Sequence, residues 1–242
     1  MNPNKSFKTW TTKNGVQITR IMGGRSNVFL CSVGGKHLLV DTSVPRLWSK
    51  LQKRLHQMGI MKLDYLILTH AHYDHAGNAF LIQHEFGARV VIHAHEEAFL
   101  LTGNNPIPKG TNFIVKPLVQ LLGKIFLNYL RYIPCKPGFV IHSDIQLPDF
   151  GNTVSIIHTP GHSPGSQSIL IDNEIALVGD AMFGIFKGSI FPPFACNVTQ
   201  MIESWGRLLE TEIIWFLPSH GSSNHRSLVQ KEYLKRRESY QT

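Results

Sequence analysis

Short apolar runs bounded by glycine and polar residues recur along most of this chain. The runs at 16–21, 27–33 and 37–40 are separated by Gly23-Gly24 and Gly34-Gly35, a pattern typical of strands joined by turns. Runs of this length favour strands over helices. Further apolar runs predict strands at 65–68, 89–92, 139–142, 153–158, 167–172, 174–178 and 213–217.

Apolar residues at helical spacing predict helices between these strands. The predicted helices run from Pro45 to Gly59, over 78–86, over 198–209, and from about residue 227 towards the C-terminus. Gly87 follows the second as a stop residue, and Asn197 precedes the third as an N-cap. Two strand-rich parts with helices between them predict an α/β (α+β) fold, in which two sheets pack face to face and helices lie outside.

The segment 103–137 does not follow this pattern. Its first part, 103–110, is rich in Asn, Pro and Gly, and apolar residues then recur at helical spacing opposite a polar face. A helix packed in the core is one interpretation. A flap over an active site, a dimer face and a membrane-surface helix are the alternatives. We expect a helical insertion that serves as a cap or a dimer element.

Length and composition fit a single domain over 1–242, with 43% hydrophobic residues. The three cysteines, Cys31, Cys135 and Cys196, are widely spaced and odd in number, which favours free thiols in a reducing compartment. The first residues lack the apolar stretch of a signal peptide, and no apolar run is long enough to span a bilayer. We therefore expect a cytoplasmic protein.

The formal net charge is +8. Basic residues gather on the helix that opens at Pro45 and on the C-terminal helix. Solvated helix faces explain such clusters, and attraction of anionic substrates, nucleic acid or a membrane surface is the alternative. Because the basic residues are not interleaved with aromatics as in a nucleic-acid-binding module, we expect no specific nucleic-acid partner.

The run His70-Ala71-His72-Tyr73-Asp74-His75 directly follows the predicted strand at 65–68. At an extended strand end His70 and His72 point to the same side, because side chains alternate. The chain then turns, so Asp74 and His75 approach from another direction. Such a cluster can hold one divalent metal and nearly complete the ligand set of a second.

Three further residues of the same chemistry follow apolar runs downstream. These are His162 in Thr-Pro-Gly-His, Asp180 after Gly179, and His220 before Gly221. Loops at strand ends are where a rigid scaffold carries functional groups. The combined set of five histidines and two aspartates predicts a metal or catalytic site rather than a structural cluster.

These motifs, together with Asp41 after an apolar run, occur in the order found in the metallo-β-lactamase-fold (glyoxalase II-like) hydrolase superfamily, which the chain resembles from about residue 20 to 221. The resemblance implies a four-layer αββα sandwich of two mixed β-sheets flanked by helices, with metals at one edge. It implies two divalent metal ions as cofactors. Zinc is preferred because imidazole and carboxylate suit it, and iron or manganese are alternatives.

The resemblance also assigns roles. It implies that His70, His72 and His162 hold the first metal, that Asp74, His75 and His220 hold the second, and that Asp180 bridges them. A hydroxide between two metals is then the nucleophile. Asp74 is the catalytic candidate, expected to orient that nucleophile and relay its proton. Asp41 is expected to hydrogen-bond near the metal-binding loops or to be only a turn residue.

Other histidines are expected to lie outside the metal set. His93 and His95 mimic the motif, but Glu96-Glu97 follow them in place of Asp-His. His158 precedes the Thr-Pro-Gly-His turn and either supports that turn or is a buried structural residue.

We expect a hydrolase of a small-molecule ester, thioester or lactone, with a substrate whose apolar tail would match the apolar insertion. Residues 179–183 resemble the corresponding segment of glyoxalase II, whereas Phe183 stands where acyl-homoserine lactonases carry Tyr. The alternatives are a phosphodiesterase or nuclease of the same fold, an iron-dependent oxidoreductase, and a binding protein without catalysis. The sequence leaves the oligomeric state open, with a homodimer as one alternative.

Overall fold

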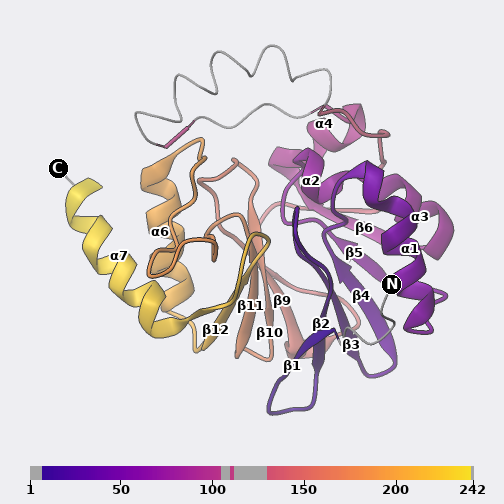
Figure 1. The fold of residues 1–242 in the computed structure, drawn as a ribbon, viewed down its shortest axis with the longest axis horizontal. Coiled ribbons are helices and arrows are strands. Elements are labelled where there is room, and N and C mark those ends of the chain that lie inside the picture. Colours follow the sequence, from indigo (N-terminus) through magenta and orange to yellow (C-terminus); the bar gives the residue numbers. More distant parts are fainter. Residues whose placement is uncertain (1–6, 105–109, 112–129, 241–242) are drawn as a thin grey trace.

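Two mixed β-sheets form the centre of the structure, a computed structural model that describes residues 7–104, 110–111 and 130–240 (Figure 1). The first sheet contains, in spatial order, β1 (Lys8–Thr11), β2 (Gln17–Met22), β3 (Val28–Val33), β4 (Lys36–Val40), β5 (Tyr65–Ile67), β6 (Arg89–His93) and β7 (Phe139–Ile141). Its strands pair antiparallel from β1 to β4 and parallel from β4 to β7.

The second sheet has the order β13 (Asn224–His225), β12 (Trp215–Pro218), β11 (Ile175–Gly179), β10 (Gln167–Ile171), β9 (Val154–His158) and β8 (Ile145–Gln146). Only β11 and β12 pair in parallel. The helical elements are η1 (Pro45–Leu47), α1 (Trp48–Gln57), α2 (Tyr73–Ala76), α3 (Ala79–Phe86), α4 (Ala94–Thr102), η3 (Gly151–Thr153), α6 (Val198–Leu209) and α7 (Arg226–Tyr240). None of these helices in the described ranges is long and apolar enough to cross a membrane.

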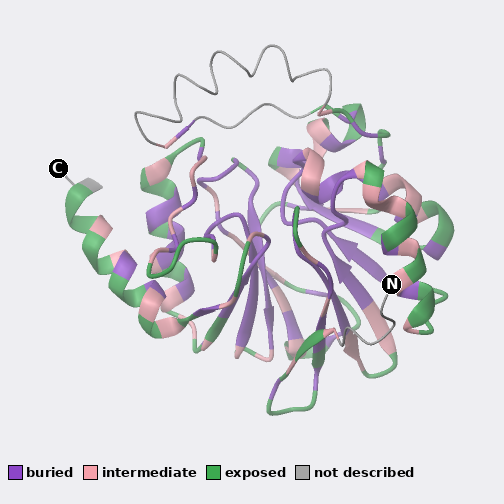
Figure 2. Ribbon diagram, in the orientation of Figure 1, coloured by how far each residue is buried: buried purple, intermediate pink, exposed green. Residues whose placement is uncertain are grey.

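Three apolar clusters hold the layers together, and burial follows the central strands (Figure 2). One lies between the sheets and contains Ile67 and Ile169. A second packs the outer face of the first sheet against α1 and α3, and a third packs the second sheet against α6 through Trp205. Strands buried on both faces read as continuous apolar runs, which explains their clear signal in the sequence.

The predicted αββα fold class is confirmed. Helix α6 spans the residues predicted for it, and the side chain of Asn197 accepts a hydrogen bond from the backbone N–H of Gln200. The sequence analysis did not predict helix α4 or the short strands β1, β8 and β13. Most of the helix predicted within 103–137 falls on residues 112–129, which lie outside the described residues.

The turn that carries His162 rests on the first turn of α6. Gly161 has a φ of +134°, and a Cβ atom there would lie 2.3 Å from the backbone N of Met201. The carbonyl oxygen of Gly161 accepts from the N–H of Asn197 at 2.9 Å. Only glycine allows this approach, because both the backbone angle and the space exclude a side chain.

We expect Gly161→Ala to lower the free energy of unfolding by about 3–4 kcal/mol, since it adds a backbone clash to the cost of a positive φ. Urea denaturation measures this. Gly15→Ala is the matched control: its φ is +84° and nothing lies within 4 Å of the added Cβ, so it should cost only about 1–2 kcal/mol. Equal losses in the two variants would contradict the packing argument.

Candidate metal centre

The first four predicted donors come from the end of β5. His70 lies in the extended segment after the strand, and His72 is the N-cap of the short helix α2. Asp74 lies in the first turn of α2 and His75 in its last. This one-turn helix is the change of direction expected from the sequence, and it brings Asp74 and His75 to the donors from a second side.

The other three donors come from the second sheet. His162 lies in the turn after β9, Asp180 follows β11, and His220 follows β12. Because β11 and β12 are parallel, their carboxyl ends meet at the same edge. The structure therefore brings all seven predicted residues to one edge of the sandwich.

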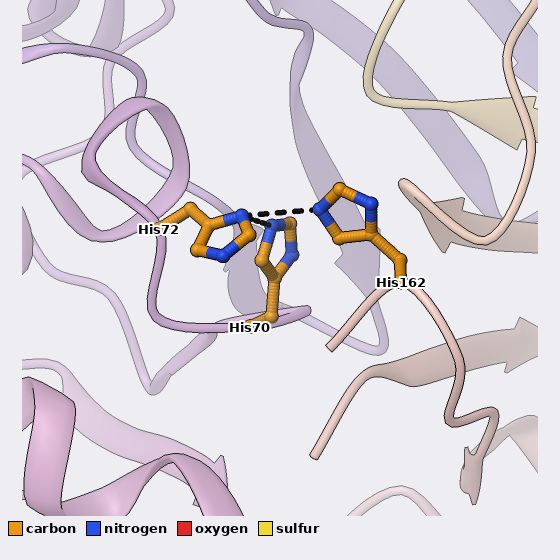
Figure 3. Close-up of side chains that lie close together, drawn as sticks. All are labelled: His70, His72 and His162. Atoms are coloured by element: carbon orange, nitrogen blue, oxygen red, sulfur yellow. Dashed lines mark hydrogen bonds between the residues drawn. The ribbon is translucent and has the colours of Figure 1, made fainter. Parts of the chain in front are cut away.

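Three imidazoles form the first donor group (Figure 3). The Nδ1 atom of His72 lies 2.9 Å from Nε2 of His70 and 3.0 Å from Nε2 of His162. All three side chains are buried. Nitrogen ligands of one tetrahedral zinc ion are about 3.3 Å apart, so this group needs little movement to hold a cation.

The second donor group contains Asp74, His75 and His220. The Nε2 atom of His75 lies 3.7 Å from Oδ1 of Asp74, and Nε2 of His220 lies 3.5 Å from Oδ2 of the same carboxylate. Asp180 lies between the two groups. Its Oδ1 is 3.5 Å from Nε2 of His75 and 3.3 Å from Nε2 of His220, while its Oδ2 is 3.5 Å from Nε2 of His162.

Two buried atoms at this point have no hydrogen-bond partner among the described residues: Nε2 of His75 and Oδ1 of Asp180. Buried polar atoms are rarely left without a partner, because the loss of hydration is costly. A lone pair on each atom, directed into a group of nitrogen and oxygen donors, fits a divalent cation. The residues therefore fit the metal ions implied by the sequence.

Hydrogen bonds on the far side of the rings fix which nitrogen is available. Nδ1 of His75 donates to Oδ2 of Asp41 at 2.8 Å, and Nδ1 of His162 donates to the carbonyl of Phe194 at 2.9 Å. Nδ1 of His70 lies 3.1 Å from the hydroxyl of Thr69, which itself donates to Asp41. Nε2 of each of these three rings is therefore the nitrogen available to bind a metal. Hydrogen-bond partners of this kind also raise the basicity of a ligating imidazole.

Burial lowers the pKa of His70 and His72 well below the ordinary value, and the neighbouring imidazoles lower it further. Burial also lowers the pKa of His162. These three rings are therefore neutral near pH 7, as a ligand must be.

The carboxylates have the opposite effect in the second group. Burial acts to lower the pKa of His75, but Asp180 and Asp41 outweigh it and raise that pKa well above the ordinary value. Burial also opposes the charged form of His220, yet Asp180 raises its pKa. The pKa of Asp180 falls well below its usual range, because His220 and His75 outweigh the effect of burial. A cation bound here takes the place of these protons.

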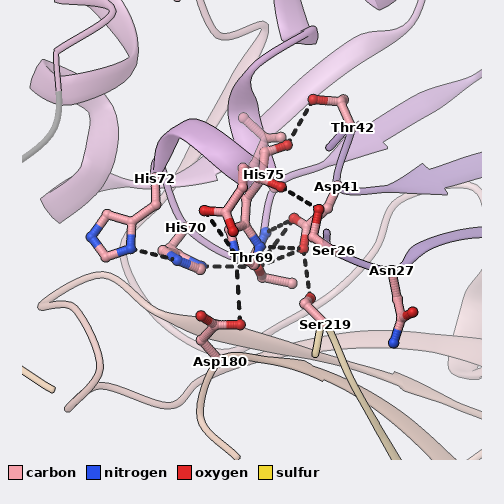
Figure 4. Close-up of polar contacts among 12 residues, drawn as sticks. Ser26, Asn27, Asp41, Thr42, Thr69, His70, His72, His75, Asp180 and Ser219 are labelled. Carbon is pink, nitrogen blue, oxygen red and sulfur yellow. Dashed lines mark hydrogen bonds and ion pairs between the residues drawn. The ribbon is translucent and has the colours of Figure 1, made fainter. Parts of the chain in front are cut away.

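Asp41 lies behind the donors and is fully buried. Its carboxylate accepts from the N–H and hydroxyl of Thr69, from His75, and from the hydroxyl of Ser219 at 3.0 Å (Figure 4). The residue thus contacts the segments that precede His70 and His220. This network favours the expected supporting role over that of a simple turn residue.

Glu96 is a buried residue that the sequence analysis did not assign to the site. Its Oε2 accepts from the N–H of Ala71 at 3.0 Å and its Oε1 from the N–H of Gly165 at 2.9 Å. The hydroxyl of Tyr132 donates to the carbonyl of Ala71 at 2.7 Å. Glu96 therefore joins the loop of His70 and His72 to the loop of His162. An acidic residue in a first helical turn is its only sequence signal.

His93, His95 and His158 form a separate group with donor atoms within 4.8 Å of one another. The rings of His93 and His158 stack with centroids 4.0 Å apart, and Nδ1 of His93 accepts from the N–H of His95 at 3.2 Å. His93 then carries its proton on the buried Nε2, which leaves no lone pair there for a metal. Burial lowers the pKa of His93 to about 4, and the neighbouring His158 contributes to this shift to a smaller extent. The stacked rings of His93 and His158 pack beside the metal centre.

A cavity of about 520 Å³ opens over the metal centre, and five of the seven donors line it. Side chains of the two donor groups form its floor, and apolar side chains form much of its wall. Its lining residues are Gly24, Arg25, His72, Tyr73, Asp74, Leu130, His162, Asp180, Phe183, Ile185, Pro193, Phe194 and His220.

The family model of the metallo-beta-lactamase superfamily matches residues 21–224, a range that contains all seven donors. The chain belongs to this superfamily. A protein of Methanocaldococcus jannaschii, named "Probable metallo-hydrolase MJ0888", is 29% identical over 208 residues, which cover 84% of this chain and 91% of that protein. The His/Asp clusters and the family match agree with the metallo-hydrolase name of this relative.

Two further relatives bear on chemistry and fold. The hydroxyacylglutathione hydrolase of Shewanella pealeana is 24% identical over 160 residues, covering 62% of this chain and 48% of that protein. The solved structure of TTHA1623 in a di-iron-bound form has a TM-score of 0.63 and 22% identity, covering 88% of this chain and 96% of that one. The second comparison supports the fold.

We expect Asp41→Asn to weaken zinc binding about 10–100-fold, because an amide cannot accept from Thr69, His75 and Ser219 together. Competition with a chromophoric chelator measures the affinity. Asp149→Asn is the matched control, since Asp149 also has a positive φ but contacts Tyr65 and Lys36 away from the donors. Unchanged affinity in Asp41→Asn would show that the network does not orient the ligands.

Glu96→Gln should lower the free energy of unfolding by about 1–3 kcal/mol, because the amide nitrogen cannot accept from both N–H groups. Hydrogen exchange at the Ala71 and Gly165 amides should become faster, and NMR would resolve both sites. Glu97→Gln, one residue away and without a hydrogen bond or ion pair in the described structure, should change neither measurement. Unaltered exchange at both amides in Glu96→Gln would refute the proposed link between the loops.

Proposed function

We propose that this chain is a dinuclear metal-dependent hydrolase that cleaves an ester, thioester or lactone bond in a small substrate. The observation that carries the proposal is the position of Asp180, whose two oxygens face His162 on one side and His75 with His220 on the other. A carboxylate in that position can serve two cations at once.

The proposed ligand sets follow from the two groups. His70, His72 and His162 would hold the first ion, Asp74, His75 and His220 the second, and Asp180 both. When bound, the ions supply an acidified water and polarise the substrate carbonyl. The nitrogen-rich donor set favours zinc, and iron is the alternative that the di-iron-bound form of TTHA1623 supports.

Asp74 is the residue of the set best placed to move a proton. Its side chain is 25% exposed and lines the cavity, whereas Asp180 is 6% exposed. We propose that Asp74 holds the attacking water and transfers its proton to the leaving group. His220, 14% exposed, lines the same cavity and faces both aspartates.

The cavity wall supports a carboxylic acid derivative with an apolar acyl group. Phe183 packs on the His220 ring with centroids 4.7 Å apart, and Leu130, Ile185, Pro193 and Phe194 extend the apolar surface. Apolar walls with a few directed polar groups are typical of small-molecule sites. The name of the Shewanella relative, a thioester hydrolase, supports including thioesters.

The described ends of the 103–137 segment support its proposed role as a cap. Gly110 forms a bridge with Phe194, and the N–H of Thr111 donates to the carbonyl of Pro193 at 2.9 Å. Leu130, at the other end, lines the cavity. A single domain, a cytoplasmic location and a homodimer remain predictions from the sequence.

A substrate panel tests the proposal. Purified protein should hydrolyse p-nitrophenyl esters or acyl thioesters faster than bis(p-nitrophenyl) phosphate and nitrocefin. After chelation the rate should fall by at least about 100-fold, since metal activation contributes several kcal/mol, and added zinc should restore it. Asp180→Asn should show the same loss and Asp149→Asn none.

Either of two results would overturn the proposal. Protein proven metal-free by elemental analysis could retain its full esterase rate, which would exclude a metal-dependent step. Dominant turnover of the phosphodiester would instead assign the site to a phosphodiesterase.

A further inference from the structure

A second hollow of about 510 Å³ adjoins the active cavity. The two share Gly24, Ile185 and His220, so His220 stands where they meet. The remaining lining residues of the second hollow are Arg20, Gly23, Asn27, Gly221 and Ser222. This lining has a larger share of polar groups than the wall around Phe183 and Phe194, and it includes no carboxylate.

Two arginines lie around this meeting point. Arg20 lies near the end of β2 and lines the second hollow, and Arg25 follows it in the β2–β3 turn and lines the active cavity. Neither forms an ion pair with a carboxylate of the described residues. The one hydrogen bond of the Arg20 guanidinium is a long one of 3.5 Å to the carbonyl of Gly221. Both guanidinium groups thus keep most of their donors for another partner.

The wall that holds these arginines is fixed to the loop of His220. The side-chain amide of Asn27 donates to the carbonyls of Pro218 at 2.8 Å and Gly221 at 3.0 Å, and its backbone N–H donates to the carbonyl of Ser219 at 2.6 Å. Gly23 lies between these groups: a Cβ there would lie 3.3 Å from Oδ1 of Asn27 and 3.6 Å from Nε of Arg20. A wall set in place before binding loses little entropy when a ligand arrives.

Arg20 in a hollow without carboxylates, with Arg25 on the neighbouring cavity wall, attracts anions to this side of His220. Arginine is suited to this role, since its planar fork binds a carboxylate or phosphate through two parallel hydrogen bonds. The apolar wall of the first cavity suits the acyl chain of the proposed substrate, so the acyl chain would lie in that cavity. The group on the other side of the scissile bond then extends past His220 into the second hollow.

We infer that the second hollow is an anion-binding arm, in which Arg20, together with Arg25 on the adjoining wall of the active cavity, holds a carboxylate or phosphate carried by the leaving group of an apolar acyl substrate. This inference rests on the proposed hydrolase function and narrows its substrate class. The substrate is then a carboxylic ester or thioester with an apolar acyl side and an acidic leaving-group side.

Matched thioesters test the arm. S-hexanoyl 3-mercaptopropionate carries a carboxylate on the leaving group, its methyl ester carries none, and a 2-mercaptoethyl phosphate thioester carries a phosphate. We expect kcat/KM for at least one charged substrate to exceed that for the neutral ester by about tenfold or more, as hydrogen bonds to charged groups imply. The more preferred of the two anions identifies the natural group. The preference should shrink with added salt.

The variant Arg20→Gln/Arg25→Gln should bring the charged-to-neutral ratio of kcat/KM close to one. Arg237→Ala on α7 removes one positive charge away from both hollows and should leave that ratio unchanged. Inhibition of the neutral reaction by inorganic phosphate should weaken in the double variant. Inhibition of the parent by phosphate, lost on raising the salt, provides a readout should the variant fail to fold.

The outcomes separate this inference from the function on which it rests. Hydrolysis of the neutral and charged thioesters at equal kcat/KM by the parent would overturn the anion-binding arm and leave the hydrolase intact. A preference that persists in the folded double variant would overturn the assignment to these arginines. Metal-replete protein that hydrolyses none of the three thioesters would instead contradict the proposed function.

Discussion

Two buried carboxylates hold the metal-binding edge of this protein in place. Asp41 accepts hydrogen bonds from Thr69, His75 and Ser219, and thereby fixes the segments around His70 and His220. Glu96 accepts from Ala71 and Gly165, and thereby fixes the loops of His72 and His162. Each carboxylate accepts hydrogen bonds from loops that belong to both sheets. The relative position of the seven donors therefore depends on these two groups, because the strands end before the donors begin.

The arrangement also assigns different electrostatic conditions to the two donor groups. The imidazoles of His70, His72 and His162 are buried and are neutral near pH 7, since burial outweighs the nearby carboxylates and lowers the pKa of each. His75 and His220 lie among carboxylates, which raise their pKa and favour the protonated forms. Protons and a cation therefore compete more strongly at the second group, so the two groups differ in affinity even though they share Asp180.

Much of the fold and the donor set could be predicted from the sequence, because both leave local signals. Strands such as β10 and β11 are buried on both faces and read as apolar runs, and the histidine motif directly follows another such run. The role of Glu96 could not be predicted, since it depends on a partner at Gly165 that is 69 residues away. Helix α4 has His93 as its N-cap in place of one of the usual capping residues, so its start gave no clear signal in the sequence. The pairing of Arg20 with a hollow at Gly221 likewise arises only from tertiary structure.

The metal-binding side chains come from the parts of the chain that build both sheets, and this affects how firmly the two layers hold together. His70, His72 and His75 come from the part of the chain that builds the first sheet, and His162, Asp180 and His220 come from the part that builds the second. Ions held from both sides would connect the two layers, and their binding energy would add to the cohesion of the fold. Scarcity of metal in the cell would then shorten the lifetime of the folded molecule as well as abolish its activity.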